Sequence, residues 1–170
     1  PADVLAPGEN VVRIMSVHKS KGLEFPVVFL AEIEKQFNME DIKADCLLDE
    51  SMTLGLTVID ARQNRSQSMV SQLIQAKKKA ASLAEEMRIL YVALTRARER
   101  LVITSDVSLE SCRRQLRYGS YIQNDAIPTW MLESCRSSLE WIIYGLSRQP
   151  AMHRLLNTGC PRDMLDKKEL

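Results

Sequence analysis

Short apolar runs at the start of the chain predict two strands. Residues 11–17 and 27–30 are rich in β-branched side chains and are brief enough to be strands, and a polar turn separates them. Strands that are apolar almost throughout are typical of a sheet covered on both faces, as in α/β domains. A further apolar run at residues 101–104 predicts another strand of this kind.

The rest of the chain reads mainly as helix. In residues 66–98 apolar positions recur at helical spacing without Gly or Pro, which predicts a long helix, either continuous or broken once. Its lysine run at 77–79 is predicted to form a solvated face. Residues 46–60 contain two short apolar runs separated by Gly55 and predict a hairpin or a small extension. After Asp106 we expect three helices that cover the sheet, at 107–117, 128–136 and 138–149, the last ending at Pro150. Residues 151–170 are expected to form a fraying tail.

Length and charge restrict the function. The 170 residues suit one domain, and 23 basic against 22 acidic residues give a net charge of +1. Such a balance provides no global positive field, so any contact with DNA must be local. The four cysteines lack metal-ligand spacing, so we expect no metal site and reduced thiols in the cytoplasm. No membrane span or signal peptide is apparent, and the initial Pro1 suggests a fragment of a longer protein.

The polar turn between the first two predicted strands contains the candidate site residues. Gly22 allows the backbone to approach a ligand, and Ser20 can cap a short helix. Ligands of open α/β sheets bind at turns that leave the carboxyl end of a strand. The charged side chains of this turn are therefore candidates: His18, Lys19, Lys21 and Glu24. Taken alone, the turn fits a solvated strand-to-helix connection better than a ligand site.

Two segments together resemble known motifs. Residues 16–29, SVHKSKGLEFPVVF, and 85–97, EEMRILYVALTRA, resemble motifs V and VI of superfamily 1 DNA helicases of the UvrD, Rep and PcrA type, in the correct order. Many of those proteins have Thr and Ala where this chain has Ser16 and Ser20. Within the superfamily, the resemblance is greatest to the A subunits of AddAB-type ATP-dependent helicase-nucleases and extends over residues 11–150.

The resemblance implies a partial RecA-like α/β domain with a mostly parallel sheet flanked by helices. Residues 1–150 would form the C-terminal part of the second motor domain, and residues 151–170 a linker to a nuclease domain. ATP and Mg²⁺ would be bound mainly by a first motor domain, because this chain has no GxxxxGK[ST] phosphate loop and no Asp-Glu pair in the expected context. We therefore expect the isolated chain not to hydrolyse ATP.

The resemblance also assigns roles to residues. Arg96 would be the catalytic arginine that stabilises the γ-phosphate, although spacing alone favours a simple partner for the helix dipole. Gly22 and Glu24 would lie on the nucleotide side. The DNA-binding residues would be His18, Lys19 and Lys21.

At the level of function, the resemblance implies a component of a helicase or translocase that acts on single- or double-stranded DNA in double-strand-break repair and recombination. A second helicase-nuclease subunit, the B subunit, would be its partner. The alternative is a non-hydrolysing, motor-derived module that binds DNA or protein. A plain single-strand-binding domain is a weaker alternative, because only 5% of the residues are aromatic.

Overall fold

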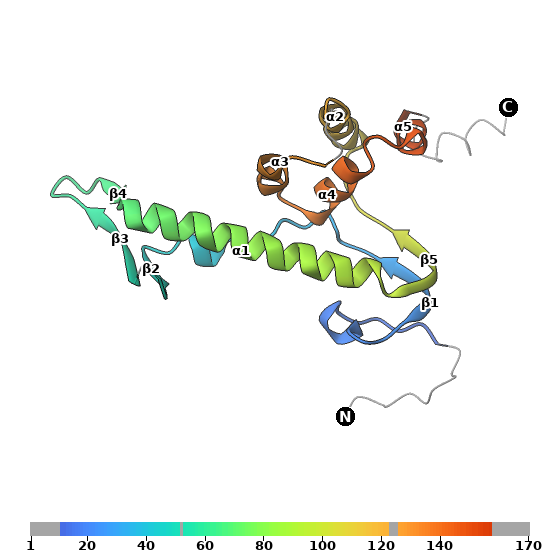
Figure 1. Ribbon diagram of the computed structural model, residues 1–170, viewed down its shortest axis with the longest axis horizontal. Coiled ribbons are helices and arrows are strands. Elements are labelled where there is room, and N and C mark those ends of the chain that lie inside the picture. The colour runs from blue at the N-terminus through green and yellow to red at the C-terminus, as the bar shows by residue number, and fades with distance from the viewer. Residues whose placement is uncertain (1–10, 52, 123–125, 158–170) are drawn as a thin grey trace.

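A single long helix organises the molecule (Figure 1). The computed structural model describes residues 11–51, 53–122 and 126–157. Helix α1 (Met69–Leu94) carries a small antiparallel sheet on its N-terminal half, while a pair of parallel strands and a group of short helices lie near its C-terminal half. This mixture of a parallel strand pair with helices confirms the predicted α/β class and is consistent with a partial RecA-like domain.

The parallel pair consists of β1 (Phe25–Leu30) and β5 (Ala97–Ile103). Val28 lies opposite Leu101 and Leu30 opposite Ile103, so the strands predicted at 27–30 and 101–104 are confirmed, as is their parallel arrangement. Strand β5 follows α1 almost directly, and the long helix thus belongs to the crossover that parallel strands require.

The prediction of a strand at residues 11–17 is wrong. This segment has no strand structure before the short 3-10 helix η1 (His18–Ser20), and the side chains of Val12 and Ile14 are 94% and 98% exposed. A strand is stabilised by a hydrogen-bonded neighbour, and among the described strands β1 pairs only with β5. The expected covering of both sheet faces is also not found in this part of the chain, since Phe29 of β1 is 71% exposed.

The predicted hairpin is confirmed and extended by a third strand. Strands β2 (Cys46–Asp49), β3 (Thr53–Ile59) and β4 (Arg65–Gln67) form an antiparallel sheet in that order. Its inner face packs on the first half of α1 through Leu47 and Ile74, which are 2% and 0% exposed. We call these three strands and that half of α1 the arm, which extends to the left in Figure 1.

Helix α1 confirms the long helix predicted from periodicity and is unbroken. Ser68 caps its beginning, because its Oγ accepts a hydrogen bond of 3.1 Å from the backbone N–H of Ser71. The predicted ends are too long by a few residues. Positions 66–67 pair in β4 with the preceding strand β3, and position 97 begins β5 and pairs with Phe25 of β1, so strand pairing sets both boundaries.

The C-terminal helices pack mainly on one another. They are α2 (Leu109–Ser120), α3 (Thr129–Ser134), α4 (Ser138–Gly145) and α5 (Pro150–Asn157), and η2 (Glu40–Ile42) is a further 3-10 turn. One small core contains Cys112, Leu116 and Ile143, and a second contains Leu83, Cys135 and Trp141. The prediction of a fraying tail is wrong for residues 151–157, which belong to α5; residues 158–170 lie outside the described residues. Among the residues that the structure describes, no helix is long and apolar enough to span a membrane.

Candidate functional site

The turn that contains the predicted site residues is held by its own hydrogen bonds. The Ser20 hydroxyl is directed back to the Val17 carbonyl at 2.7 Å, and the Leu23 N–H donates to the Ser20 carbonyl at 3.0 Å. Ser20 therefore closes the turn, instead of capping the start of a helix as predicted. Gly22 has a φ of 81°, and a Cβ built there would meet nothing within 4 Å. Backbone conformation, and not crowding, requires glycine at this position, and the space beside it is open.

The turn enters the amino end of β1. The sequence predicts that it leaves the carboxyl end of an earlier strand, and the lack of strand structure at residues 11–17 corrects that placement. The backbone N–H of Phe25 donates to the Arg96 carbonyl at 3.0 Å, just where the ladder between β1 and β5 begins. The turn and the C-terminal end of α1 thus meet at the end of the parallel strand pair where both strands begin (Figure 1).

Arg96 joins the end of α1 to the turn. Its side chain is partly buried, and its Nε donates to the Val92 carbonyl at 2.9 Å. Its Nη1 donates to the Leu23 carbonyl at 2.9 Å, and its Nη2 to Thr95 Oγ1 at 3.0 Å. A guanidinium has five N–H groups, so these three bonds fix its plane and leave two N–H groups for another acceptor.

The structure brings most of the predicted site residues onto this turn. Gly22 and Glu24 flank Leu23, the residue whose carbonyl accepts from Arg96. The Glu24 carboxylate is exposed and lies 4.0 Å from Arg98 Nε, a separation at which an ion pair between exposed groups contributes little. The side chains of the remaining three are also exposed: His18, Lys19 and Lys21. The roles assigned to these residues stay predictions.

The donor groups of the described residues offer little to a metal ion. Across the described ranges, no group of three or more His, Cys, Asp or Glu side chains is arranged so that it could hold one. At the turn, Glu24 provides a single carboxylate.

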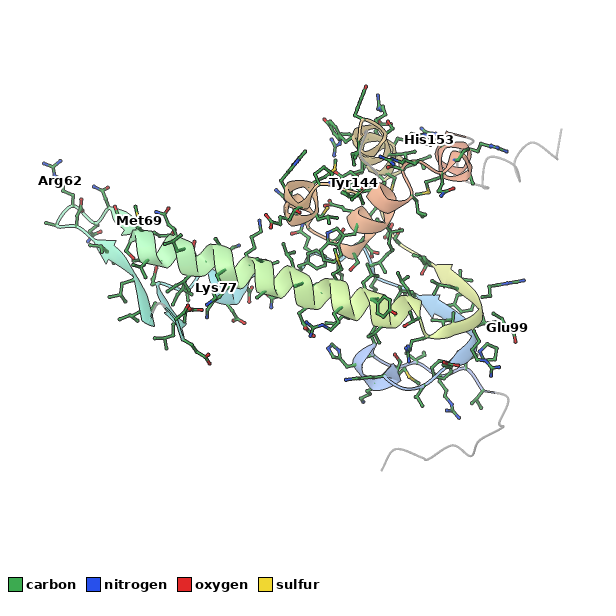
Figure 2. The ribbon with its side chains drawn as sticks, in the orientation of Figure 1. Arg62, Met69, Lys77, Glu99, Tyr144 and His153 are labelled. Carbon is green, nitrogen blue, oxygen red and sulfur yellow. The ribbon has the colours of Figure 1, made fainter. Side chains whose placement is uncertain are left out.

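A polar network in the arm has no counterpart among the predictions. Lys77 Nζ lies 2.8 Å from Asp49 Oδ2 and 2.8 Å from Ser51 Oγ, and it joins α1 to β2 (Figure 2). The hydrogen bonds from Lys77 and then Ser51 hold the pKa of the Asp49 carboxyl well below its usual range. The lysine run predicts a solvated face, and the Lys77 side chain is 51% exposed, but its ion pair with Asp49 is not predicted. Partners this distant in sequence leave no local signal.

An aromatic cavity between α2, α3 and α4 is also absent from the predictions. It has a volume of about 710 Å³, and Tyr144 lies among these helices in Figure 2. Its aromatic lining residues are Tyr118, Tyr121, Trp130 and Tyr144. These are four of the nine aromatic residues in the chain, so the low aromatic content conceals a local concentration.

Comparison with known proteins identifies relatives of the chain. The family model described as the UvrD-like helicase C-terminal domain matches residues 4–108. The chain is 40% identical over 162 residues to the A subunit of the ATP-dependent helicase/nuclease of Clostridium kluyveri, a match that covers 94% of the chain and 13% of that protein. The proteins of the same name from Anoxybacillus flavithermus and Acetivibrio thermocellus are 44% and 43% identical over 146 and 164 residues, covering 85% and 95% of the chain. The chain spans 12–13% of the length of these relatives.

Proposed function

The chain belongs to the family of UvrD-like helicase C-terminal domains, and from this membership we propose that it contributes one side of the ATP site of a helicase-nuclease. The observation that carries the proposal is the position of Arg96. Its guanidinium is fixed by three acceptors at the edge of the Gly22 turn and has two N–H groups left for an anion.

In this proposal, residues 1–150 are the C-terminal part of a second motor domain, and residues 151–170 are a linker toward a nuclease domain. Exposed apolar side chains in β1 and in the segment that precedes the Gly22 turn support an incomplete domain. Val12, Ile14 and Phe29 are 94%, 98% and 71% exposed, and β1 has an edge that no described strand pairs. Large exposed apolar side chains and an open strand edge are features that proteins normally cover.

Arg96 would act on charge that develops during hydrolysis. Phosphoryl transfer spreads negative charge over the transferred group, and an arginine directed at it from across a cleft stabilises the transition state more than the ground state. The residues at the turn fit a phosphate group: a partly buried guanidinium with unused donors is bonded to the carbonyl of Leu23, the residue after Gly22, where a Cβ would meet nothing within 4 Å. Mg²⁺, when bound, would neutralise phosphate charge. We assign its ligands and the phosphate loop to a first motor domain.

The same turn would hold the DNA backbone. His18, Lys19 and Lys21 are exposed and lie within four positions of one another, which suits contacts to successive phosphates. Such contacts carry no sequence information, and they weaken as salt rises because binding releases counterions. With a net charge of +1, the chain should contribute only weakly to DNA affinity.

The wider role is proposed from the relatives. Each is named as one lettered subunit of a helicase/nuclease, which implies assembly with a second, the B subunit. A helicase-nuclease of this kind suits the processing of broken DNA ends in repair and recombination. Under the alternative, a non-hydrolysing module that binds DNA or protein, Arg96 would have no part in turnover.

The test is Arg96→Ala in the full-length protein, assayed for DNA-stimulated ATP hydrolysis. We expect a loss of about 10³- to 10⁵-fold in kcat, the range found for arginines of this kind. Arg96→Lys should also fail, because a point charge cannot replace the planar fork that reaches Leu23 and Thr95 together. Circular dichroism and DNA binding should remain close to wild type.

Arg98→Ala is the matched control, since it removes the same charge two residues away, where the guanidinium forms a long ion pair of 4.0 Å with Glu24. A large loss confined to Arg96 supports the proposal. If both alanine variants lose the same small fraction of activity, Arg96 only stabilises the C-terminal end of α1 and the proposed catalytic role is wrong.

A further inference from the structure

We propose that Thr95 is a positioning residue that holds the Arg96 guanidinium in the plane needed for catalysis. This inference rests on the catalytic role proposed for Arg96. It concerns the hydroxyl group of Thr95, which is exposed at the end of α1 and contacts both the helix and the arginine.

The direction of the hydrogen bonds follows from chemistry. Thr95 Oγ1 lies 3.0 Å from the Tyr91 carbonyl and 3.0 Å from the Val92 carbonyl, and a carbonyl can only accept. The hydroxyl proton therefore points to the end of the helix, and the oxygen lone pairs face away from it. The Arg96 guanidinium can only donate, and its Nη2 meets that oxygen at 3.0 Å.

The three acceptors of Arg96 have different consequences. The Val92 and Leu23 carbonyls belong to the backbone, so no side-chain substitution at those positions removes them. Thr95 is the one acceptor among the three that a mutation can delete. Without it, the guanidinium keeps its Nε and Nη1 bonds but loses the bond that fixes Nη2. The end of the side chain can then tilt away from the reacting geometry.

A tilt of this kind should reduce turnover more than substrate binding. Displacing a catalytic group by about 1 Å can cost on the order of 10²-fold in rate. We therefore expect Thr95→Val, which keeps the shape and removes the hydroxyl, to lower kcat for ATP by about 10- to 100-fold in the full-length protein. The KM for ATP should change little, because the lost interaction matters mainly in the transition state.

The alternative is that Thr95 only caps the helix, since a threonine hydroxyl bonded to a carbonyl one turn earlier is common in helices. A double mutant separates the two roles. If Thr95 acts through Arg96, Thr95→Val should cause no further loss of kcat in an Arg96→Ala background. If Thr95 acts by another route, its effect should appear in full there. Thr95→Ser keeps the hydroxyl and should restore most of the activity.

The experiment measures steady-state ATP turnover with saturating single-stranded DNA for Thr95→Val, Thr95→Ser, Arg96→Ala and the double mutant. Thermal unfolding of each variant checks that it is folded. The inference is overturned if Thr95→Val turns over ATP like the wild type, if Thr95→Ser is as impaired as Thr95→Val, or if the double mutant is clearly slower than Arg96→Ala. Normal turnover in Arg96→Ala would instead refute the proposed function itself.

Discussion

Gly55→Ala is the substitution for which the structure gives the most definite expectation of lost stability. Gly55 lies in β3, where the arm sheet packs on α1. A Cβ at this position would lie 2.7 Å from Ser71 Cα, 3.0 Å from Ser71 N and 3.1 Å from Ile74 Cδ1. The two nearest atoms belong to the helix backbone, which cannot rotate away as a side chain could. The strand must therefore move away from the helix.

The size of the effect follows from what that movement disturbs. Leu47, Ser71 and Ile74 are all nearly or fully buried at this contact, with exposed fractions of 2%, 0% and 0%. Forcing an extra methyl group into a well-packed interior typically costs about 1–3 kcal/mol. For a chain of this length, each kcal/mol shifts Tm by about 2–4 °C, so we expect Tm to fall by about 2 to 12 °C.

Gly145→Ala is the matched control, because it adds the same methyl group where a Cβ would meet nothing within 4 Å. Its Tm should be unchanged or slightly higher, since alanine restricts the unfolded chain more than glycine does. Thermal unfolding of the 170-residue chain, followed by circular dichroism, measures both variants. If Gly55→Ala is as stable as Gly145→Ala, β3 does not pack against α1 as closely at Gly55 as described.

Two further predictions concern titratable groups. Because the pKa of Asp49 is lowered in the folded state, its carboxylate should stabilise the fold above about pH 4, the pKa of the unfolded chain, and lose that contribution as pH falls further. The difference in Tm between wild type and Asp49→Asn should therefore be largest near neutral pH and become smaller in acid. A difference in Tm that does not change with pH would exclude this linkage. Burial raises the pKa of the Cys135 thiol to about 12 and also raises that of Cys112, while Cys46 is exposed. In a Cys160→Ser background at about pH 8, peptide mapping after thiol labelling should find Cys46 modified first, and equal labelling of the three would contradict the burial.

Local sequence patterns predict those helices and strands whose own residues show the periodicity or the β-branched run typical of the element. Helical periodicity finds α1, and β-branched runs find β1 and β5. Strand β4 escapes prediction because Arg65–Gln67 has no apolar residue, and its pairing with β3 alone makes it a strand. The sequence predicts a helix at 138–149 that ends at Pro150, but α4 already ends at Gly145. Pro150 is instead the first residue of α5, a position where its fixed φ and missing N–H suit a helix.

The site can be predicted at the level of side chains and not of contacts. Motif resemblance selects Arg96 and the Gly22 turn, and the structure places them together. It cannot indicate how the arginine is held, because two of its acceptors are the backbone carbonyls of Leu23 and Val92. Every residue has such a carbonyl, so no pattern of side chains reveals which ones accept. Thr95 carries the one visible signal, a hydroxyl directly before the arginine.

The two ends of α1 allow stability and chemistry to be tested separately. Gly55 meets the helix at Ser71, whereas the bonds of Arg96 are made at its C-terminal end. The helix has 26 residues and no Gly or Pro, so at 1.5 Å per residue its ends lie about 39 Å apart. A displacement of β3 should therefore leave the Arg96 contacts intact. In the full-length protein, Gly55→Ala should melt earlier yet hydrolyse ATP normally well below its Tm. If its turnover fell as far as that of Thr95→Val, the arm and the arginine would be coupled along α1, and Thr95 would not be acting only on its neighbour.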